Sequence, residues 1–166
     1  FQLIAAMIPC KCGWYGTPRC PCSPREVRQY LHRLSGPLLD RIDLQVAVQP
    51  VSYAALAARG ERSEESSADI RRRVLDARAR QAARFAGLGL RVNADIPPAY
   101  MAEFCPVDAA GQAMLRAAFD RLGLTARAYD RLLRMARTAA DLAGQEVIGA
   151  AQIAEALSYR TLDRMG

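Results

Sequence analysis

The sequence predicts a mainly helical chain in which two short strands and one helix precede a bundle of further helices. Three patterns support this class. Residues 2–7 are a short, mostly apolar run, suited to a strand that is buried on both faces. Residues 42–48 alternate apolar and polar side chains, which indicates a second strand. Beyond residue 68 the apolar side chains recur at spacings of three and four, as they do in amphipathic helices.

Capping residues mark where the helices begin. Ser23 can cap a helix whose first position is Pro24, and Glu26 completes a capping box, so we expect a helix that ends near Leu34. Asp108 and Thr125 are expected to cap two later helices, and a last helix is expected over residues 150–159. A further helix is predicted over residues 68–85, with an inner face formed by Ile70, Val74, Ala77, Gln81 and Phe85.

The polar residues 59–67 are expected to be a linker between two parts, residues 1–58 and residues 68–166. No apolar run reaches the roughly 18 residues of a membrane span. The apolar start of the chain has no basic region before it, so it does not resemble a signal peptide. We therefore expect a cytoplasmic protein without membrane contact, and we expect residues 2–7 to be a strand from the middle of a larger protein.

The chain is basic, with a net charge of +6, and Lys11 is its only lysine among 23 basic residues. One interpretation is a compositional bias of the genome, and the other is affinity for the phosphates of nucleotides or nucleic acid. The helix predicted over 68–85 allows the same two interpretations, a solvated basic face or a nucleic-acid contact. Its candidate contacts are Arg71, Arg72, Arg73, Arg78, Arg80 and Arg84.

Four of the five cysteines lie within thirteen residues, as two Cys-x-Cys pairs: Cys10, Cys12, Cys20 and Cys22. Four thiolates are a complete tetrahedral set for a structural zinc ion, and Gly13, Gly16 and Pro18 permit the chain reversal that this needs. The single residue inside each pair departs from the more familiar spacing of two. Free structural thiols therefore remain the alternative to a metal site.

Two arginines stand where a phosphate contact is conceivable. Arg41 directly precedes the second predicted strand, and Arg127 falls in the first turn of the helix that Thr125 caps. A cation opposes the helix dipole at that end, whereas a helix N-terminus together with an arginine makes a good anion site. The alternative for both is an ordinary surface arginine, which for Arg127 could be paired with Asp130.

Long segments of the chain resemble the magnesium-chelatase-like AAA+ proteins of bacteria, and most of all their competence-associated ComM (YifB-like) group. The resemblance is carried by residues 1–7, the Pro9-Cys-Lys-Cys-Gly13 and Cys20-Pro-Cys-Ser-Pro24 runs, residues 34–44, residues 125–131 and residues 136–142. It runs in register over nearly the whole chain. It implies that the chain is the C-terminal portion of such a protein, the distal edge of an α/β AAA+ core followed by a helical lid.

The resemblance also implies a function. Proteins of this family are hexameric ATPases, and the ComM group is associated with branch migration of DNA during natural transformation. By this resemblance Arg41 matches the arginine finger that acts on the ATP of a neighbouring subunit, and Arg127 matches the sensor-2 arginine of the lid. The four cysteines match the cysteine-rich insertion of the family, which favours zinc.

Two features limit what the chain is expected to do alone. By the same resemblance, residue 8 is the polar sensor-1 position, but here it is Ile8, whose side chain cannot form a hydrogen bond. The 166 residues contain no Gly-x4-Gly-Lys-[Ser/Thr] run to hold phosphates and no obvious acidic pair for Mg²⁺. ATP and Mg²⁺ would be bound mainly by the N-terminal AAA+ half, the expected partner of this chain. We therefore expect no ATP hydrolysis by the chain alone.

Two other functions remain open. The first is a chelatase-type motor subunit that helps to insert Mg²⁺ into a tetrapyrrole, although the cysteine insertion resembles the ComM group instead. The second is a stand-alone nucleic-acid-binding module that uses the cysteine knuckle and the arginine-rich helix. Steeply salt-dependent DNA binding by this chain would favour that module.

Overall fold

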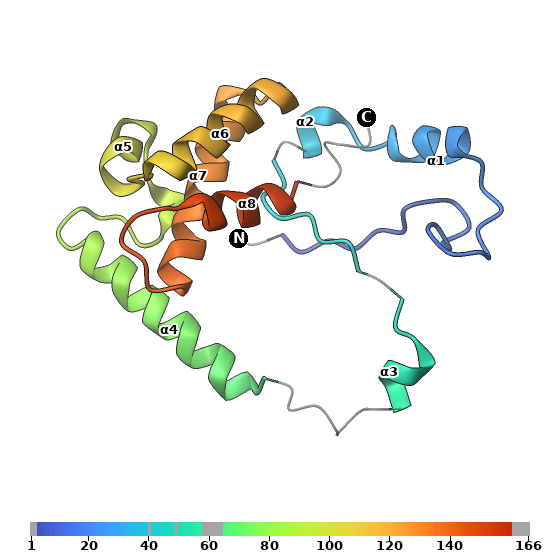
Figure 1. The fold of residues 1–166 in the computed structure, drawn as a ribbon, viewed down its shortest axis with the longest axis horizontal. Helices are drawn as coiled ribbons and strands as arrows, with labels where there is room; N and C mark the ends of the chain where they lie inside the picture. Colours follow the sequence, from blue (N-terminus) through green and yellow to red (C-terminus); the bar gives the residue numbers. More distant parts are fainter. Residues whose placement is uncertain (1–2, 40, 49, 58–64, 161–166) are drawn as a thin grey trace. The chain divides into compact units, whose positions relative to one another are not determined.

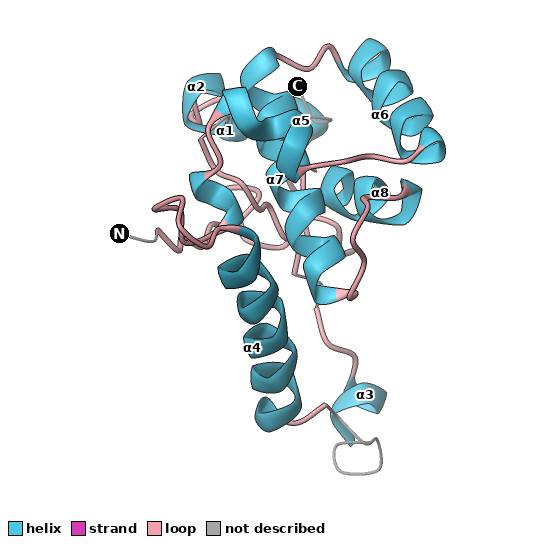
Figure 2. Cartoon of the chain, turned by 90° about the vertical axis from the view of Figure 1, so that its left-hand side faces the viewer, coloured by secondary structure: helices cyan, strands magenta, loops and turns pink. Residues whose placement is uncertain are grey.

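The computed structural model describes residues 3–39, 41–48, 50–57 and 65–160. The chain divides into two compact units between Ile42 and Asp43. The described part of the second unit is mainly helical, whereas the first unit is a long loop followed by two short helices (Figures 1 and 2). The predicted mainly helical class is thus confirmed. None of the described helices is long and apolar enough to cross a membrane.

The first unit contains the cysteine-rich loop and two helices, α1 (Pro24–Leu31) and α2 (Gly36–Leu39). The predicted capping box begins α1. The Glu26 amide donates to Ser23 Oγ at 3.3 Å, and the Ser23 amide donates to Glu26 Oε2 at 2.9 Å. The helix ends at Leu31, three residues before the predicted end, and a turn leads from it to α2.

The second unit is a helical bundle centred on α7 (Ala126–Leu142). This helix packs against α4 (Ser67–Arg84) and α8 (Ala150–Ser158), and α6 (Ala109–Leu122) packs against α8. Leu132, Ala136 and Ala140 of α7 are fully buried in the core, as their spacing predicts. The remaining elements are α3 (Tyr53–Ala57), α5 (Met101–Phe104) and the short 3-10 turns η1 (Asn93–Asp95) and η2 (Pro98–Tyr100).

The predicted helix caps of this unit are confirmed. Asp108 Oδ1 accepts the amide of Gly111 at the start of α6, and Thr125 Oγ1 accepts the amide of Ala128 at 3.1 Å at the start of α7. Each side chain thus satisfies one of the amides that a helix start leaves without a partner. Gly123 ends α6 in the left-handed conformation that favours glycine, with φ +59°.

Helix α4 is packed along only part of its predicted inner face. Ala77, Gln81 and Phe85 are buried, whereas Ile70 and Val74 are each 44 % exposed. Figures 1 and 2 show why, because the N-terminal half of α4 extends beyond the bundle formed by α6, α7 and α8. The periodicity of the sequence therefore continues along a face that no described helix covers.

The two predicted strands are wrong for the described residues. Residues 3–8 form no strand, and Leu3 and Ile4 are exposed. Residues 42–48 make one isolated parallel pairing, in which the Gln45 amide donates to the carbonyl of Tyr159 at 2.8 Å. A strand is stable only as part of a ladder, and the described residues offer neither segment a neighbouring strand. Gln2, the first residue of the predicted run, lies outside the described residues.

The observed division of the chain falls earlier than the predicted linker. Asp43 and Gln45 belong to the helical unit, where Asp43 pairs with Arg131 of α7 at 3.3 Å. Residues 58–64 of the predicted linker region lie outside the described residues. The boundary expected at residue 58 therefore stays a prediction.

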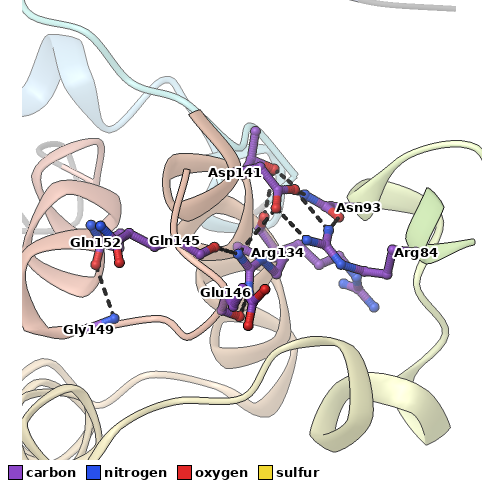
Figure 3. Close-up of polar contacts among 10 residues, drawn as sticks. Arg84, Asn93, Arg134, Asp141, Gln145, Glu146, Gly149 and Gln152 are labelled. Carbon is purple, nitrogen blue, oxygen red and sulfur yellow. Dashed lines mark hydrogen bonds and ion pairs between the residues drawn. The ribbon is translucent and has the colours of Figure 1, made fainter. Parts of the chain in front are cut away.

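A buried carboxylate connects three elements of the second unit. Asp141, near the end of α7, accepts hydrogen bonds from Arg84 of α4 and, at 2.8 Å, from the amide group of Asn93 in η1. Arg137, one turn earlier on α7, forms an ion pair with the same carboxylate at 3.1 Å. Figure 3 shows Arg84 and Asn93 directed at Asp141 from the neighbouring segment.

The partners of this carboxylate are themselves buried. Arg137 is 1 % exposed and also donates to the backbone carbonyls of Gln145 and Glu146, which follow the end of α7. Burial alone would raise the pKa of Asp141, but the hydrogen bonds from Arg84 and Asn93 and the charge of Arg137 leave it below its usual value. The folded protein therefore holds Asp141 ionised.

We predict that Asp141→Ala lowers the free energy of unfolding of the second unit by about 3–5 kcal/mol, because it leaves two guanidinium groups without their shared carboxylate. Urea denaturation followed by circular dichroism measures this loss. The matched control is Asp120→Ala at an exposed position of α6, which should change stability by less than about 0.5 kcal/mol. A loss below about 1 kcal/mol in Asp141→Ala would contradict the structural role of this cluster.

The pH dependence of the free energy of unfolding tests the role of Asp141 in a second way. Because the pKa of Asp141 is lower in the folded state, its contribution is complete above the unfolded value, about 3.9, and is lost as the pH falls through the folded value. Stability of the parent chain should therefore fall more steeply on acidification than that of Asp141→Ala. If the free energy of unfolding fell equally steeply with pH in both proteins, Asp141 would not be the group responsible.

Candidate functional site

The structure brings the four clustered cysteines of the first unit together. The ligand atoms of Cys10, Cys12, Cys20 and Cys22 all lie within 4.8 Å of one another. The Sγ atom of Cys10 lies 3.3 Å from that of Cys12 and 3.8 Å from that of Cys20, and Cys12 Sγ lies 3.6 Å from Cys20 Sγ. These four side chains could hold a metal ion.

The loop reaches this arrangement through successive tight turns. The amides of Gly13, Thr17 and Cys20 each donate to the carbonyl three residues earlier, at 3.1 Å. Gly13 and Gly16 both have φ +81°, a conformation in which a side chain would be strained. The glycines between the cysteine pairs therefore make the reversal possible, as the sequence predicts.

The sulfur positions fit a tetrahedral ion. Four thiolates bound at about 2.3 Å place neighbouring sulfurs about 3.8 Å apart, close to the three separations observed. A set of four protein ligands leaves no open coordination position, so such a centre is structural and not catalytic. Soft thiolates favour zinc over Mg²⁺ or Ca²⁺, which prefer oxygen ligands.

The thiols of the cluster differ in acidity. Burial alone would raise the pKa of Cys10, but hydrogen bonds from its neighbours, Cys12 first, lower it to about 6. Burial raises the pKa of Cys20 to about 12 and also raises that of Cys22. One thiolate therefore forms readily, and a bound cation would displace the remaining protons.

An ion pair fastens the cysteine loop to α1. Lys11, between the first two cysteines, pairs with Glu26 in the first turn of α1. The hydrogen bond from Lys11, followed by those from Ser23, lowers the pKa of Glu26 to about 2. The capping box and the cysteine loop thus share one carboxylate, a connection that the sequence pattern alone does not reveal because fifteen residues separate the two charges.

Arg41 and Arg127 lie in different units, and both are exposed. Arg41 follows α2, and its Nη1 donates to the carbonyl of Pro37 at 2.7 Å. Arg127 is the second residue of α7, beside the Thr125 cap, and the described residues offer its side chain no acidic partner. Asp130, the expected alternative partner, forms no ion pair with it in the described part of the chain. Among the described residues, neither arginine forms an ion pair.

The arginines of α4 do not form one uniform face. Arg72 pairs with Asp69 at 3.1 Å and Arg73 with Glu65 at 2.9 Å, both at exposed positions. Arg71, Arg78 and Arg80 are exposed as well. Arg84 differs, because its side chain is 19 % exposed and is bound to Asp141.

Arg84 thus differs from the other predicted nucleic-acid contacts because it has a structural partner, and the predicted contacts themselves stay predictions. Its guanidinium group is committed to the buried carboxylate and to Asn93. The sequence does not reveal this role, because Asp141 lies 57 residues further along the chain. The i,i+4 spacing of Arg137 and Asp141 on one helix was the available sign of a buried ion pair.

Ile8, at the expected sensor-1 position, is exposed and follows a segment without strand structure. Its side chain offers no hydrogen bond to an attacking water. The described residues thus show an apolar side chain where the family resemblance leads one to expect a polar one.

Comparison with protein families identifies the class to which this chain belongs. Residues 64–160 match the model of the C-terminal region of the magnesium chelatase subunit ChlI, and residues 1–56 match the model of the magnesium chelatase subunit ChlI itself. The chain therefore belongs to the magnesium chelatase ChlI-like family. The expected resemblance is confirmed over both units.

Curated relatives are similar over almost the whole chain. It is 39 % identical over 165 residues to the competence protein ComM of Haemophilus influenzae, covering 99 % of this chain and 31 % of that protein. It is 37 % identical over 165 residues to the uncharacterized protein YifB of Escherichia coli, covering 99 % of this chain and 32 % of the relative. An uncharacterized protein of Mycobacterium bovis is 41 % identical over 161 residues, covering 96 % and 31 % respectively. The chain thus spans about a third of the length of these relatives.

We predict that the purified chain contains about one zinc ion, measured by elemental analysis, because the four thiols fit one tetrahedral ion. Cys20→Ala should lose most of this zinc. The control is Cys105→Ala, since Cys105 is buried among apolar residues of the other unit and should leave the zinc content unchanged. Zinc-free wild-type protein that still has an ordered loop would contradict a metal centre.

Proposed function

We propose that this chain is the nucleotide-sensing and force-transmitting part of an AAA+ motor ATPase that acts on DNA as a hexamer. The main support is the similarity to a competence protein over 99 % of the chain. Two exposed arginines, Arg41 and Arg127, have no acidic partner among the described residues and supply the charge that such a role needs. ATP and Mg²⁺ belong to the proposal as ligands held mainly by an N-terminal AAA+ half, with which this chain works in the cytoplasm.

In this proposal Arg41 is an arginine finger that acts on the ATP of the neighbouring subunit. A guanidinium at that position stabilises the charge that develops on the transferred phosphoryl group. The hydrogen bond to the Pro37 carbonyl holds the exposed side chain near the end of α2 without neutralising it. Such a contact is easily exchanged for a phosphate oxygen, which forms a stronger, charge-assisted bond.

Arg127 is proposed to contact the nucleotide of its own subunit as the sensor-2 arginine. It stands in the first turn of α7, where unpaired amides and the helix dipole favour an anion. Helix α7 is the centre of the bundle, and Asp141 near its other end connects it to α4. A nucleotide bound at Arg127 would therefore move the bundle as one body.

The cysteine centre is proposed to bind structural zinc. The first unit buries few apolar side chains among its described residues, chiefly Cys10 and Val27. A metal ion would supply the stability that such a small core cannot provide. Its bond to four thiolates would fix the loop, and Lys11 would connect that loop to α1.

A chelatase-type motor that inserts Mg²⁺ into a tetrapyrrole is the second candidate. The names of both matching family models favour it. The four-cysteine loop and the similarity to a competence protein favour the DNA-acting motor instead. Stimulation of the complete protein's ATPase by DNA supports the first candidate, and stimulation by a porphyrin-bound partner supports the second.

We predict that Arg41→Ala in the complete protein lowers ATP turnover by about 1,000-fold or more and leaves nucleotide affinity nearly unchanged, as expected for a residue that acts in the transition state. Turnover is measured by phosphate release and affinity by a fluorescent nucleotide. Arg28→Ala on exposed α1 is the matched control and should retain turnover. Unchanged turnover in Arg41→Ala would rule out the arginine-finger role.

For Arg127→Ala we predict a loss of about 10- to 100-fold in turnover, because one charge-assisted hydrogen bond to the nucleotide disappears. Arg116→Ala, an exposed position on α6, serves as the control with normal turnover. The circular dichroism of both variants should equal that of the parent, since neither side chain is buried. Full activity of Arg127→Ala would show that this arginine does not contact nucleotide.

A further inference from the structure

The tip of the cysteine loop exposes two aromatic side chains. Trp14 and Tyr15 lie between the cysteine pairs and are 49 % and 43 % exposed. Trp14 is the only tryptophan of the chain. Large aromatic side chains left open to solvent in so short a loop have no core to stabilise. They are therefore candidates for contact with a ligand.

These side chains are presented by an ordered loop. The Trp14 amide donates to Cys12 Sγ at 3.4 Å, and its carbonyl accepts the hydroxyl of Thr17 at 2.8 Å. The turns at Gly13 and Gly16 fix both ends of the aromatic pair. The same backbone that gathers the thiols thus holds the aromatic rings in place, which reduces the entropy cost of binding.

The charge around the tip has one sign. The guanidinium carbon of Arg19 lies 5.3 Å from the centre of the Trp14 ring. Residues 1–25 contain no acidic side chain, and Glu26, the first one, is already paired with Lys11. The tip is therefore an aromatic surface beside a cation that forms no ion pair with the described residues.

We infer that this tip binds single-stranded nucleic acid, with bases stacked on Trp14 and Tyr15 and the backbone phosphates near Arg19. Exposed aromatic rings interleaved with cations are the chemistry by which proteins hold unpaired bases. A duplex hides its base faces by stacking them on each other, so it offers these rings little to contact. The inference rests on the proposed action on DNA. It adds that the cysteine-loop unit contacts single-stranded rather than duplex DNA.

The test uses the zinc-loaded chain and a single-stranded oligothymidylate of about 12 nucleotides, which has no structure of its own. Binding is followed by quenching of Trp14 fluorescence and by the anisotropy of a labelled oligonucleotide. Tyr15→Ala and Arg19→Ala are each expected to weaken binding about 10-fold. Trp14→Ala, followed by anisotropy alone, should weaken it at least as much.

Matched controls come from the other unit. Tyr53→Ala removes an exposed tyrosine and Arg116→Ala removes an exposed arginine, and both should bind the oligonucleotide as the parent does. Zinc content is measured for every variant, so that a collapsed loop is distinguished from a lost contact. Weakened binding in a tip variant that retains its zinc supports the inference.

Each of the following results would overturn it: binding without any change in Trp14 fluorescence, equal affinity of tip and control variants, or tighter binding to duplex than to single strand. It would also be overturned if the tip variants lost binding to a protein partner while they kept binding to the oligonucleotide. The ATPase of Arg41→Ala is measured without DNA. If the tip does not bind the oligonucleotide but Arg41→Ala still loses ATP turnover, only this inference is wrong and the proposed function stands.

Discussion

The stability of the helical unit depends on one buried carboxylate, that of Asp141, which two arginines share. Asp141 pairs with two of the many arginines of this basic chain, Arg137 of its own helix and Arg84, and Arg84 joins α4 to α7. Burial of an arginine is tolerated only with such a partner, because an isolated buried charge costs several kcal/mol. Arg127, which has no acidic partner among the described residues, stays exposed and available for a ligand. This division between structural and exposed arginines underlies the proposed function.

The first unit is stabilised differently. It has little apolar core, and its order comes from the turns that gather four thiols, from the capping box of α1 and from the ion pair of Lys11 with Glu26. A metal ion bound to those thiols would take the place of a hydrophobic core. The same loop would then serve two purposes, because the backbone that places the sulfurs also places Trp14 at its tip.

Local patterns predicted local structure well. Ser23, Asp108 and Thr125 each cap the expected helix, since a cap depends only on residues a few positions away. The cysteine cluster was predictable for the same reason. The strands were not, because their alternation needs a neighbouring strand that the described residues do not contain. The role of Arg84 was also hidden, since its partner is distant in sequence and nearby only after folding.

The proposed function requires that Arg41 complete an ATP site in a neighbouring subunit. It is tested most directly by mixing two inactive forms of the complete protein, one carrying Arg41→Ala and the other retaining Arg41 but with a disabled phosphate-binding loop. Phosphate release is then measured in the mixed assembly. We expect mixing to restore turnover, because intact loops meet intact arginines across the subunit boundary. A mixture that co-assembles and stays inactive would contradict it.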